Sequence, residues 1–279
     1  MAARYIMNWA GFELTRPLVM GILNVTPDSF SDGGQNFDPD AAITAGRRML
    51  SEGADILDIG GESTRPGALP VDVEEEMART LPVIRTLAAE GAVISLDTRN
   101  AATMAAGLKA GVRIINDVSA FTHDKAALGV VAKWGCPVIL MHMRGTPATM
   151  NGQAIYRDVV REVASELVSL RDTALAAGVS MNNICLDPGF GFAKGGDHNI
   201  ALLKSLSHFT ELGHPVLVAL SRKRFLGEIS AEREARRRDP ESLAADLYAV
   251  AQGAHIVRVH DTAGTARALR VWHRLTETT

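Results

Sequence analysis

The sequence has little of what would place the protein in a membrane, outside the cell or on a nucleic acid. No apolar run approaches the roughly 20 residues that a spanning helix needs, and the first residues lack the apolar core of a signal peptide. The formal net charge is only −3 with both signs mixed, which argues against a nucleic acid or a membrane surface as the main partner. There are two cysteines, Cys136 and Cys185, and we expect both to be free thiols in a reducing cytoplasm.

The chain also lacks signs of a second domain. It has 279 residues, with no composition shift and no low-complexity segment, and 47% of its residues are hydrophobic, enough for a large core. A barrel of eight βα units takes about 250 residues, so we expect one such domain to account for residues 1–279.

Eight short apolar runs are the dominant pattern, each followed by a helix-length stretch. They cover residues 18–25, 54–61, 92–98, 113–119, 137–143, 183–189, 215–221 and 255–260. Because a buried parallel strand is almost continuously apolar, the pattern predicts an α/β fold, a (β/α)8 barrel. Residues 4–17 precede the first run, and the turn signal Ala10-Gly11 within them predicts a β-hairpin that caps the bottom of the barrel.

Helical periodicity fills the stretches between the runs. Asp38 is a good N-cap before Pro39, and Gly253 a good stop signal. The predicted helices are 39–52, 72–90, 100–110, 124–134, about 154–177, 197–210, 240–252 and 262–275. Three loops, 26–37, 62–71 and 144–153, are long or rich in glycine, which is typical either of functional loops or of irregular filler.

Polar residues lie near the ends of the eight runs, where a barrel presents them to its mouth. They are Asn24, Asp58, Asp97, Asn116 with Asp117, His142, Asp187, Ser221 and His260. Asp97 and Asp187 would be carboxylates in an apolar cup, which need partners such as the N–H groups of a guanine-like or pterin-like ring, and Asn116 adds a donor and an acceptor. Salt bridging or loop capping explains these aspartates equally well; Asp58 is ambiguous, Asp117 could simply anchor the next loop, and His142 is more typical of a satisfied core histidine.

Cations gather after the last two runs. Ser221–Arg224 follow the seventh run, and Arg258 and His260 lie two apart on the eighth, so they face the same way. In barrels this side of the mouth commonly binds phosphate, although cations that satisfy helix C-termini are the alternative. The sequence has no His/Cys metal cluster, but the amide oxygen of Asn24 could ligate Mg²⁺, which takes its other ligands from phosphate and water.

These segments together resemble the dihydropteroate synthase family, a group of pterin-binding TIM barrels. LVMGILNVTPDSFSDGG and GADILDIGGESTRPGA resemble its first two signatures. ISLDT, IINDV, PVILMHM, LDPGFGF, SRK and HIVRVHD resemble its later strand-end motifs in the right order, over about residues 18–262. The resemblance implies a transferase, usually a homodimer, that condenses 6-hydroxymethyl-7,8-dihydropterin pyrophosphate with p-aminobenzoate through a dissociative step with a pterin cation, with Mg²⁺ as cofactor.

The resemblance also implies a role for each matching residue. Asp97, Asn116, Met141, Asp187, Lys223 and Arg258 should bind the pterin; Asn24, Thr64, Arg65, Arg258 and His260 the pyrophosphate, with Asn24 also on the metal; and Phe30, Thr64, Pro66, Phe192, Lys223 and Arg224 the p-aminobenzoate. Asp32, Lys223, Arg258 and His260 should be catalytic. The chain departs from the family at Asn100, where a lysine is frequent, and at Arg224, where a serine is frequent.

Two other functions stay open from the residues alone. A methyltetrahydrofolate-binding methyltransferase uses the same barrel and pterin cup but would not need the STRPG loop or the cations of the last two strands. A non-catalytic pterin-binding paralogue should have lost strand-end polar residues, whereas all remain here.

Overall fold

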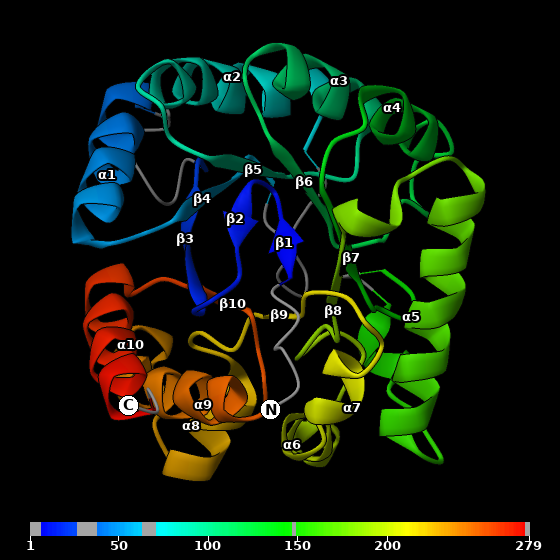
Figure 1. Cartoon of the computed structure of the whole chain (residues 1–279), viewed down its shortest axis with the longest axis vertical. Helices are drawn as coiled ribbons and strands as arrows, with labels where there is room; N and C mark the ends of the chain where they lie inside the picture. The colour runs from blue at the N-terminus through cyan, green and yellow to red at the C-terminus, as the bar shows by residue number, and fades with distance from the viewer. Residues whose placement is uncertain (1–6, 27–37, 63–70, 147–148, 277–279) are drawn as a thin grey trace.

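Eight parallel strands form a ring in the computed structural model, which describes residues 7–26, 38–62, 71–146 and 149–276 (Figure 1). The strands are β3 (Leu18–Asn24), β4 (Ile56–Gly60), β5 (Ile94–Asp97), β6 (Ile114–Asp117), β7 (Val138–Met141), β8 (Ile184–Asp187), β9 (Leu217–Val218) and β10 (Ile256–Val259). Their order is β8-β7-β6-β5-β4-β3-β10-β9, and a parallel bridge between Leu186 and Val216 joins the two ends. The predicted (β/α)8 barrel is confirmed.

Ten α-helices lie in the described ranges, most of them around the outside of the ring (Figure 1). They are α1 (Pro39–Glu52), α2 (Val73–Ala89), α3 (Ala101–Lys109), α4 (Ala127–Trp134), α5 (Val159–Ala176), α6 (Gly196–Lys204), α7 (Ser207–Thr210), α8 (Arg224–Ser230), α9 (Asp239–Ala251) and α10 (Thr262–Thr276). Three short 3₁₀ helices, Met150–Gln153, Met181–Asn183 and Ala235–Arg237, lie between them. None of the helices in these ranges is long and apolar enough to span a membrane.

The first helix, α1, begins and ends at the capping residues that the sequence predicts. The Asp38 side chain accepts from the Asp40 N–H at 2.9 Å, and Pro39 occupies the first turn. Gly46 sits on the buried face, where an added Cβ would lie 2.7 Å from the Leu87 side chain. The helix ends at Gly53, whose φ of +109° favours glycine.

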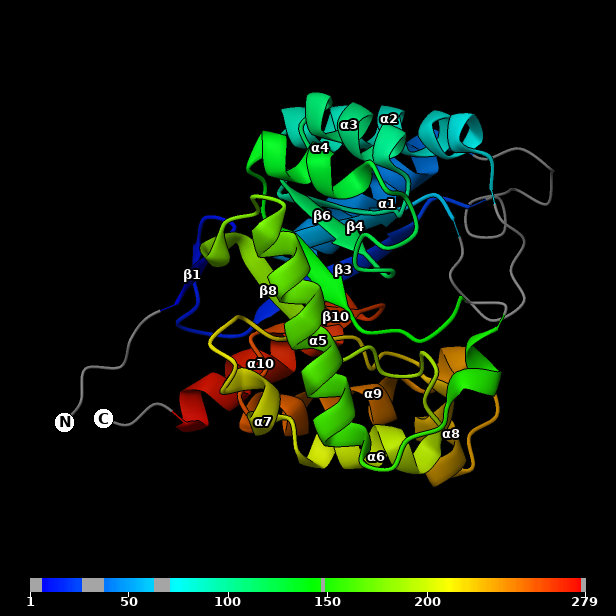
Figure 2. The ribbon, with the colours of Figure 1, turned by 90° about the vertical axis from the view of Figure 1, so that its right-hand side faces the viewer.

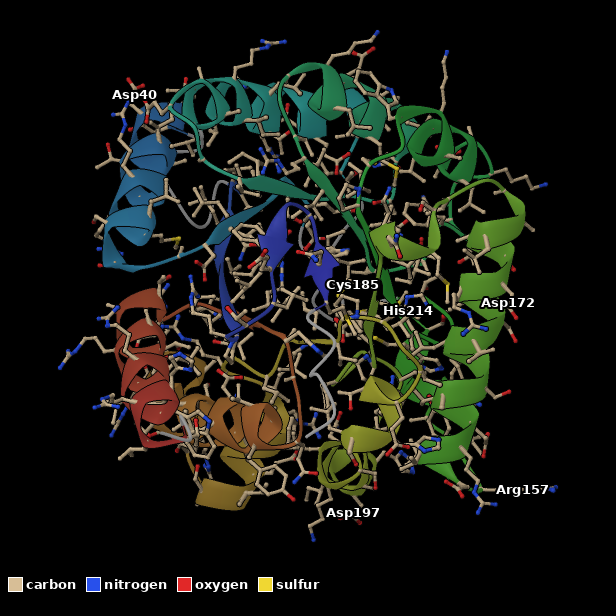
Figure 3. All side chains as sticks on the ribbon, in the orientation of Figure 1. Asp40, Arg157, Asp172, Cys185, Asp197 and His214 are labelled. Atoms are coloured by element: carbon tan, nitrogen blue, oxygen red, sulfur yellow. The ribbon has the colours of Figure 1, made fainter. Side chains whose placement is uncertain are left out.

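The N-terminal hairpin closes one end of the barrel, as predicted. β1 (Asn8–Trp9) pairs antiparallel with β2 (Phe12–Glu13), and Ala10 and Gly11 both have positive φ, as a tight two-residue turn requires. Trp9 is buried against interior residues of the barrel such as Cys185 and donates from Nε1 to the Asn183 carbonyl at 3.0 Å. Figure 2 shows β1 at one end of the barrel and α8 toward the other, and Figure 3 places Cys185 in the middle of the ring.

Two predicted elements differ from the structure. The seventh strand is only Leu217–Val218, because the chain turns at once: the Lys223 N–H donates to the Leu220 carbonyl at 3.1 Å. The single helix predicted over 197–210 is broken at Ser205 into α6 and α7.

Candidate active site

The polar ends of β4, β5, β6 and β10 meet in one charged cluster. Arg258 donates from Nε to Asp58 at 2.5 Å and from Nη2 to Asp97 at 2.8 Å. Asn116, the partner of Asp97 in the strand register, donates to the same Asp58 oxygen at 3.1 Å. Asn24 lies in register with Gly60, and Gly60 with Asp97, so three neighbouring strands present these positions side by side.

Burial raises the pKa of Asp97 to about 7, although the charge of Arg258 opposes the shift. Asp58 is completely buried, and its Oδ1 has no hydrogen-bond partner in the described residues. Two carboxylates, Asp58 and Asp97, therefore share one guanidinium, and the Asp58 Oδ1 atom can still accept a hydrogen bond.

A second cluster surrounds Asp187 at the end of β8. Asp187 is 3% exposed and accepts from the Gly189 N–H at 2.7 Å. Burial raises its pKa to about 6, and the Gly189 N–H and the charge of Lys223 oppose the shift. Met141 is its register partner on β7 and borders Gly189, where an added Cβ would lie 3.3 Å from the methionine Cγ.

Lys223 joins this cluster from the turn after β9. Its Nζ lies 4.4 Å from the centre of the Phe192 ring, and burial lowers its pKa to about 8. Gly191 has φ +79° and lies against the lysine stem, so that a Cβ there would come within 3.3 Å of Lys223 Cδ. The structure thus brings Asp187, Phe192 and Lys223 together.

The other cations after β9 have different roles. Arg222 pairs with Asp239 at 2.7 Å, and the side chain of Arg224 is 89% exposed and pairs with Glu228 at 2.7 Å. The side chains of Arg222 and Arg224 thus form ion pairs with carboxylates, neither at the phosphate side of the mouth nor at a helix C-terminus, and of these three cations only Lys223 lies with Asp187.

His260 is oriented by its neighbouring strand end. The Ser221 hydroxyl lies 2.9 Å from His260 Nδ1 and accepts from the His260 backbone N–H at 3.1 Å. β10 ends at Val259, so His260 lies just beyond the strand that carries Arg258, whereas the sequence predicts both residues on it.

Asp117 and His142 have the structural roles that the sequence offers as alternatives to binding. Asp117 accepts from the Ser119 and Phe121 backbone N–H groups at 2.7 and 2.9 Å and so anchors the loop after β6. His142 is buried and bonded on both ring nitrogens, to Glu166 at 2.8 Å and to Lys194 at 2.9 Å. Lys194 could not be predicted from the sequence, because a single lysine outside any periodic pattern carries no signal of burial.

Five predicted site residues lie outside the described residues. They are Phe30, Asp32, Thr64, Arg65 and Pro66. Their roles stay predictions that rest on the resemblance. No group of three or more His, Cys, Asp or Glu side chains that could hold a metal occurs in the part of the chain that the structure describes.

Comparison with known proteins identifies the family of the chain. A family model described as "Pterin binding enzyme" matches residues 20–260. The chain is 46% identical to the dihydropteroate synthase of Neisseria meningitidis serogroup C over 98% of each chain. It is 44% identical to that of Escherichia coli K12 over 93% of this chain and 92% of the other.

Solved structures agree with the sequence matches. The dihydropteroate synthase of Xanthomonas albilineans with 4-aminobenzoic acid has a TM-score of 0.91 and 46% identity, over 96% of each chain. The Yersinia pestis enzyme with a sulfonamide drug complex has a TM-score of 0.90 and 41% identity, over 99% of this chain and 98% of the other. The chain therefore belongs to the pterin-binding enzymes and, among them, to the dihydropteroate synthase family of transferases.

Proposed function

We propose that this chain condenses 6-hydroxymethyl-7,8-dihydropterin pyrophosphate with p-aminobenzoate, forming 7,8-dihydropteroate and releasing pyrophosphate. One observation carries the proposal: buried carboxylates, Asp97 and Asp187, lie with the cations Arg258 and Lys223 at the strand ends. Such a site offers acceptors to ring N–H groups and cations to an anion. Related structures from Xanthomonas albilineans contain 4-aminobenzoic acid and 7,8-dihydropteroate.

Asp187 is the proposed main anchor of the pterin ring, because its carboxylate can accept from two adjacent N–H groups. Asp97 and Asn116 would bind the opposite part of the ring. Met141, Lys223 and Arg258 would pack along it. Asp58 would keep Arg258 in place when the pterin takes over Asp97, because Asp58 holds the guanidinium Nε at 2.5 Å.

Bond breaking comes first in the proposed reaction. The C–O bond to pyrophosphate breaks, the electron pair leaves with pyrophosphate, and the dihydropterin ring delocalises the cation left on its exocyclic carbon. Arg258 and His260 would stabilise the departing charge. The lone pair of the neutral p-aminobenzoate amine then forms a C–N bond to the exocyclic carbon. The resulting arylammonium is acidic enough to give its proton to water, so the reaction requires no strong base.

Phe192 and Lys223 would form the described part of the p-aminobenzoate pocket. Arg224 would contribute its backbone N–H to the p-aminobenzoate carboxylate, since its side chain points to Glu228. Phe30, Thr64 and Pro66 would complete the pocket and Asp32 would stabilise the cation, all by resemblance.

An assay of pyrophosphate release separates this function from the alternatives. We expect release from the pterin pyrophosphate to depend on added p-aminobenzoate. A corrinoid-dependent methyltransferase would instead transfer a methyl group from methyltetrahydrofolate, and a non-catalytic paralogue would do neither. The comparisons favour the synthase, because every relative named above is one.

Activity is expected to require Mg²⁺, which when bound would neutralise charge on the leaving pyrophosphate. Asn24 fits such an ion, because it is a half-buried amide oxygen at the end of β3 and Mg²⁺ commonly uses few protein ligands beside phosphate and water. Excess chelator should reduce turnover at least about 100-fold, and added Mg²⁺ should restore it. Full turnover in excess chelator would contradict the metal role.

Pterin binding is expected to weaken at low pH. The pKa of Asp187 is about 6 in the empty site, and a protonated carboxyl cannot accept both ring N–H groups. Protonation of Asp187 alone should therefore lower the affinity about tenfold between pH 7 and pH 5, and protonation of Asp97, whose pKa is about 7, should add to the loss. Calorimetry at both pH values tests this, with Asp187→Asn as the control that should keep only the dependence caused by Asp97. Equal affinity at pH 5 and pH 7 would exclude an ionised Asp187 as the anchor.

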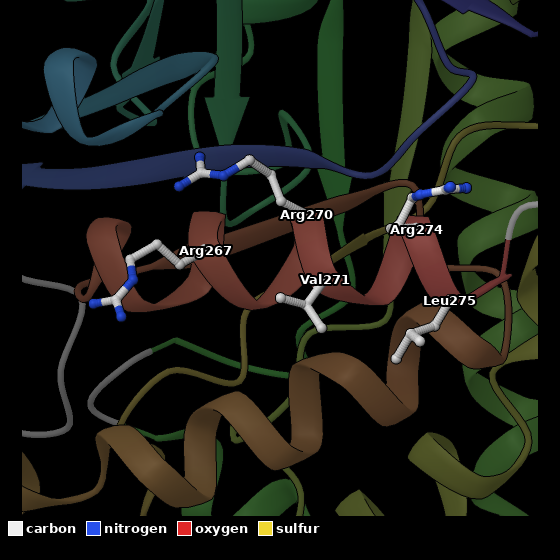
Figure 4. Close-up of a pocket in the computed structure, with 5 residues that line it drawn as sticks. All are labelled: Arg267, Arg270, Val271, Arg274 and Leu275. Atoms are coloured by element: carbon white, nitrogen blue, oxygen red, sulfur yellow. The ribbon is translucent and has the colours of Figure 1, made fainter.

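We also propose a homodimer that uses the outer surface of α9 and α10. Val271 and Leu275 on α10 are 61% and 78% exposed, and Tyr248 on the neighbouring α9 is 43% exposed. Figure 4 shows Val271 and Leu275 on one side of α10, with Arg270 and Arg274 on the other, at a surface hollow. Exposed apolar side chains grouped in this way are typical of an interface.

The paired variant Val271→Glu with Leu275→Glu is expected to be a monomer where the wild type is a dimer, because like charges would meet at the interface. Light scattering during size-exclusion chromatography at micromolar concentration measures this. A monomeric wild type would contradict the dimer, and a dimeric variant would contradict this surface.

We further propose that residues 1–279 form one domain. We also propose that the enzyme is cytoplasmic, which the two free, buried cysteines support.

A further inference from the structure

Lys194 is a buried lysine that the reaction outlined above does not use. It is 8% exposed, and lysine is rarely so buried unless it is paired. Its Nζ donates to the carbonyl oxygens of Phe192 at 2.8 Å and Gly189 at 3.0 Å, and the His142 carbonyl oxygen lies 3.3 Å away. Nζ also lies 2.9 Å from His142 Nδ1. The ammonium group therefore ties the loop after β8 to the end of β7.

His142 extends this connection away from the site. Burial lowers the pKa of Lys194 to about 7. In its ammonium form Lys194 only donates, so His142 Nδ1 accepts from it, and Nε2 donates to Glu166 at 2.8 Å. Burial lowers the pKa of His142 to about 4, so the ring is neutral, as this arrangement requires. Glu166 in turn pairs with Arg144, whose guanidinium lies 4.0 Å from the centre of the Tyr156 ring.

The loop that Lys194 holds has little freedom elsewhere. Gly189 has φ +70°, and an added Cβ would lie 2.0 Å from the His142 carbonyl oxygen, so the two chains are in close contact. The Gly189 carbonyl accepts from both the Phe192 N–H at 3.1 Å and Lys194. Ala193 has φ +52°, a strained value for a residue with a side chain. These features fix where the Phe192 ring stands relative to Lys223.

We propose that Lys194 is a positioning residue: by binding the Phe192 and Gly189 carbonyls it holds the Phe192 ring over Lys223 and so shapes the p-aminobenzoate side of the site. It touches neither substrate. This inference rests on the proposed role of Phe192 as a wall of that pocket.

The experiment compares three lysine variants in steady-state kinetics. K194M keeps the length of the side chain but removes every donor, and K194Q keeps two donors. K204M is the matched control, because Lys204 is an exposed lysine in the last turn of α6. We expect K194M to raise KM for p-aminobenzoate at least about tenfold, with kcat and the calorimetric affinity for the pterin pyrophosphate within about threefold of wild type.

K194Q should fall between wild type and K194M, and K204M should match wild type. A general loss of structure would instead lower kcat in step with the folded fraction. If K194M does not fold, K194Q decides: a rise of about threefold in KM supports the proposal, and a KM equal to that of wild type overturns it.

F192L separates this inference from the function on which it rests. If F192L raises KM for p-aminobenzoate and neither Lys194 variant does, Lys194 has no positioning role while Phe192 keeps its own. If F192L leaves KM for p-aminobenzoate unchanged, Phe192 is not a wall of the pocket. A higher KM in K194M would then have another cause, and the proposal would be overturned. With both roles correct, the effects of F192L and K194M on KM are not additive, because both act through one ring.

Discussion

Asp187→Ala is expected to weaken binding of the dihydropterin more than 100-fold, about 3 kcal/mol or more. Asp187 is almost completely buried, and the described residues give its carboxylate one strong donor, the Gly189 N–H at 2.7 Å. The remaining acceptor capacity suits a two-toothed, charge-assisted contact to the ring. Alanine removes both hydrogen bonds and leaves the ring N–H groups without an acceptor in a dry site.

The variant should still fold, because Asp187 lies at the barrel mouth and burial disfavours its ionised form. The raised pKa of about 6 means that the ionised form costs stability in the empty enzyme. Asp172→Asn is the matched control, since Asp172 is an exposed aspartate at the periphery of the molecule (Figure 3). Calorimetry and thermal unfolding measure both effects, and an affinity for the pterin pyrophosphate within about threefold of wild type would show that Asp187 is not the anchor.

The architecture could be predicted because it depends on repeated patterns. Each buried parallel strand is a continuous apolar run, and a polar residue such as Asn24 or Asp187 marks its carboxyl end. The hairpin could be predicted because Ala10 and Gly11 must adopt positive φ in its turn. These signals are local, and local signals are what a single sequence carries.

The short strand β9 and the break at Ser205 could not be predicted in this way. Val216 is apolar and buried like its neighbours, yet it makes only a single bridge, because the ring closes there. Strand length at a closure depends on how the two ends of the ring meet, which no local pattern records.

A local sequence pattern also could not show which individual charged side chains lie in the site. Arg222, Lys223 and Arg224 are consecutive, and only Lys223 lies with Asp187. Arg222 has φ +59°, which turns the chain so that its neighbours point in different directions. Lys194 was missed for a related reason: its partners are backbone carbonyls, and a carbonyl leaves no mark in a sequence.

Arg258→Met is expected to lower turnover at least about 1000-fold, about 4 kcal/mol of transition-state stabilisation. Arg258 lies among the strand ends, bound to Asp58 at 2.5 Å and to Asp97 at 2.8 Å. Without it the leaving pyrophosphate would lose a donor that is already oriented in a largely buried site. Arg47→Met is the matched control, because Arg47 is an exposed arginine on α1 paired with Glu90.

Arg258→Met should also have a lower free energy of unfolding than the wild type, and this deficit should grow with pH. Burial raises the pKa of Asp97 from 3.8 to about 7 even beside Arg258, and removing the guanidinium raises it further. The folded variant then keeps this proton to a higher pH than the folded wild type does, so its free energy of unfolding goes on falling above pH 7, where that of the wild type levels off. The deficit relative to wild type should therefore be smaller at pH 5 than at pH 8 in urea unfolding. Turnover above a tenth of wild type in folded Arg258→Met would remove Arg258 from the reaction, and a stability deficit independent of pH would mean that Asp97 is not the group it neutralises.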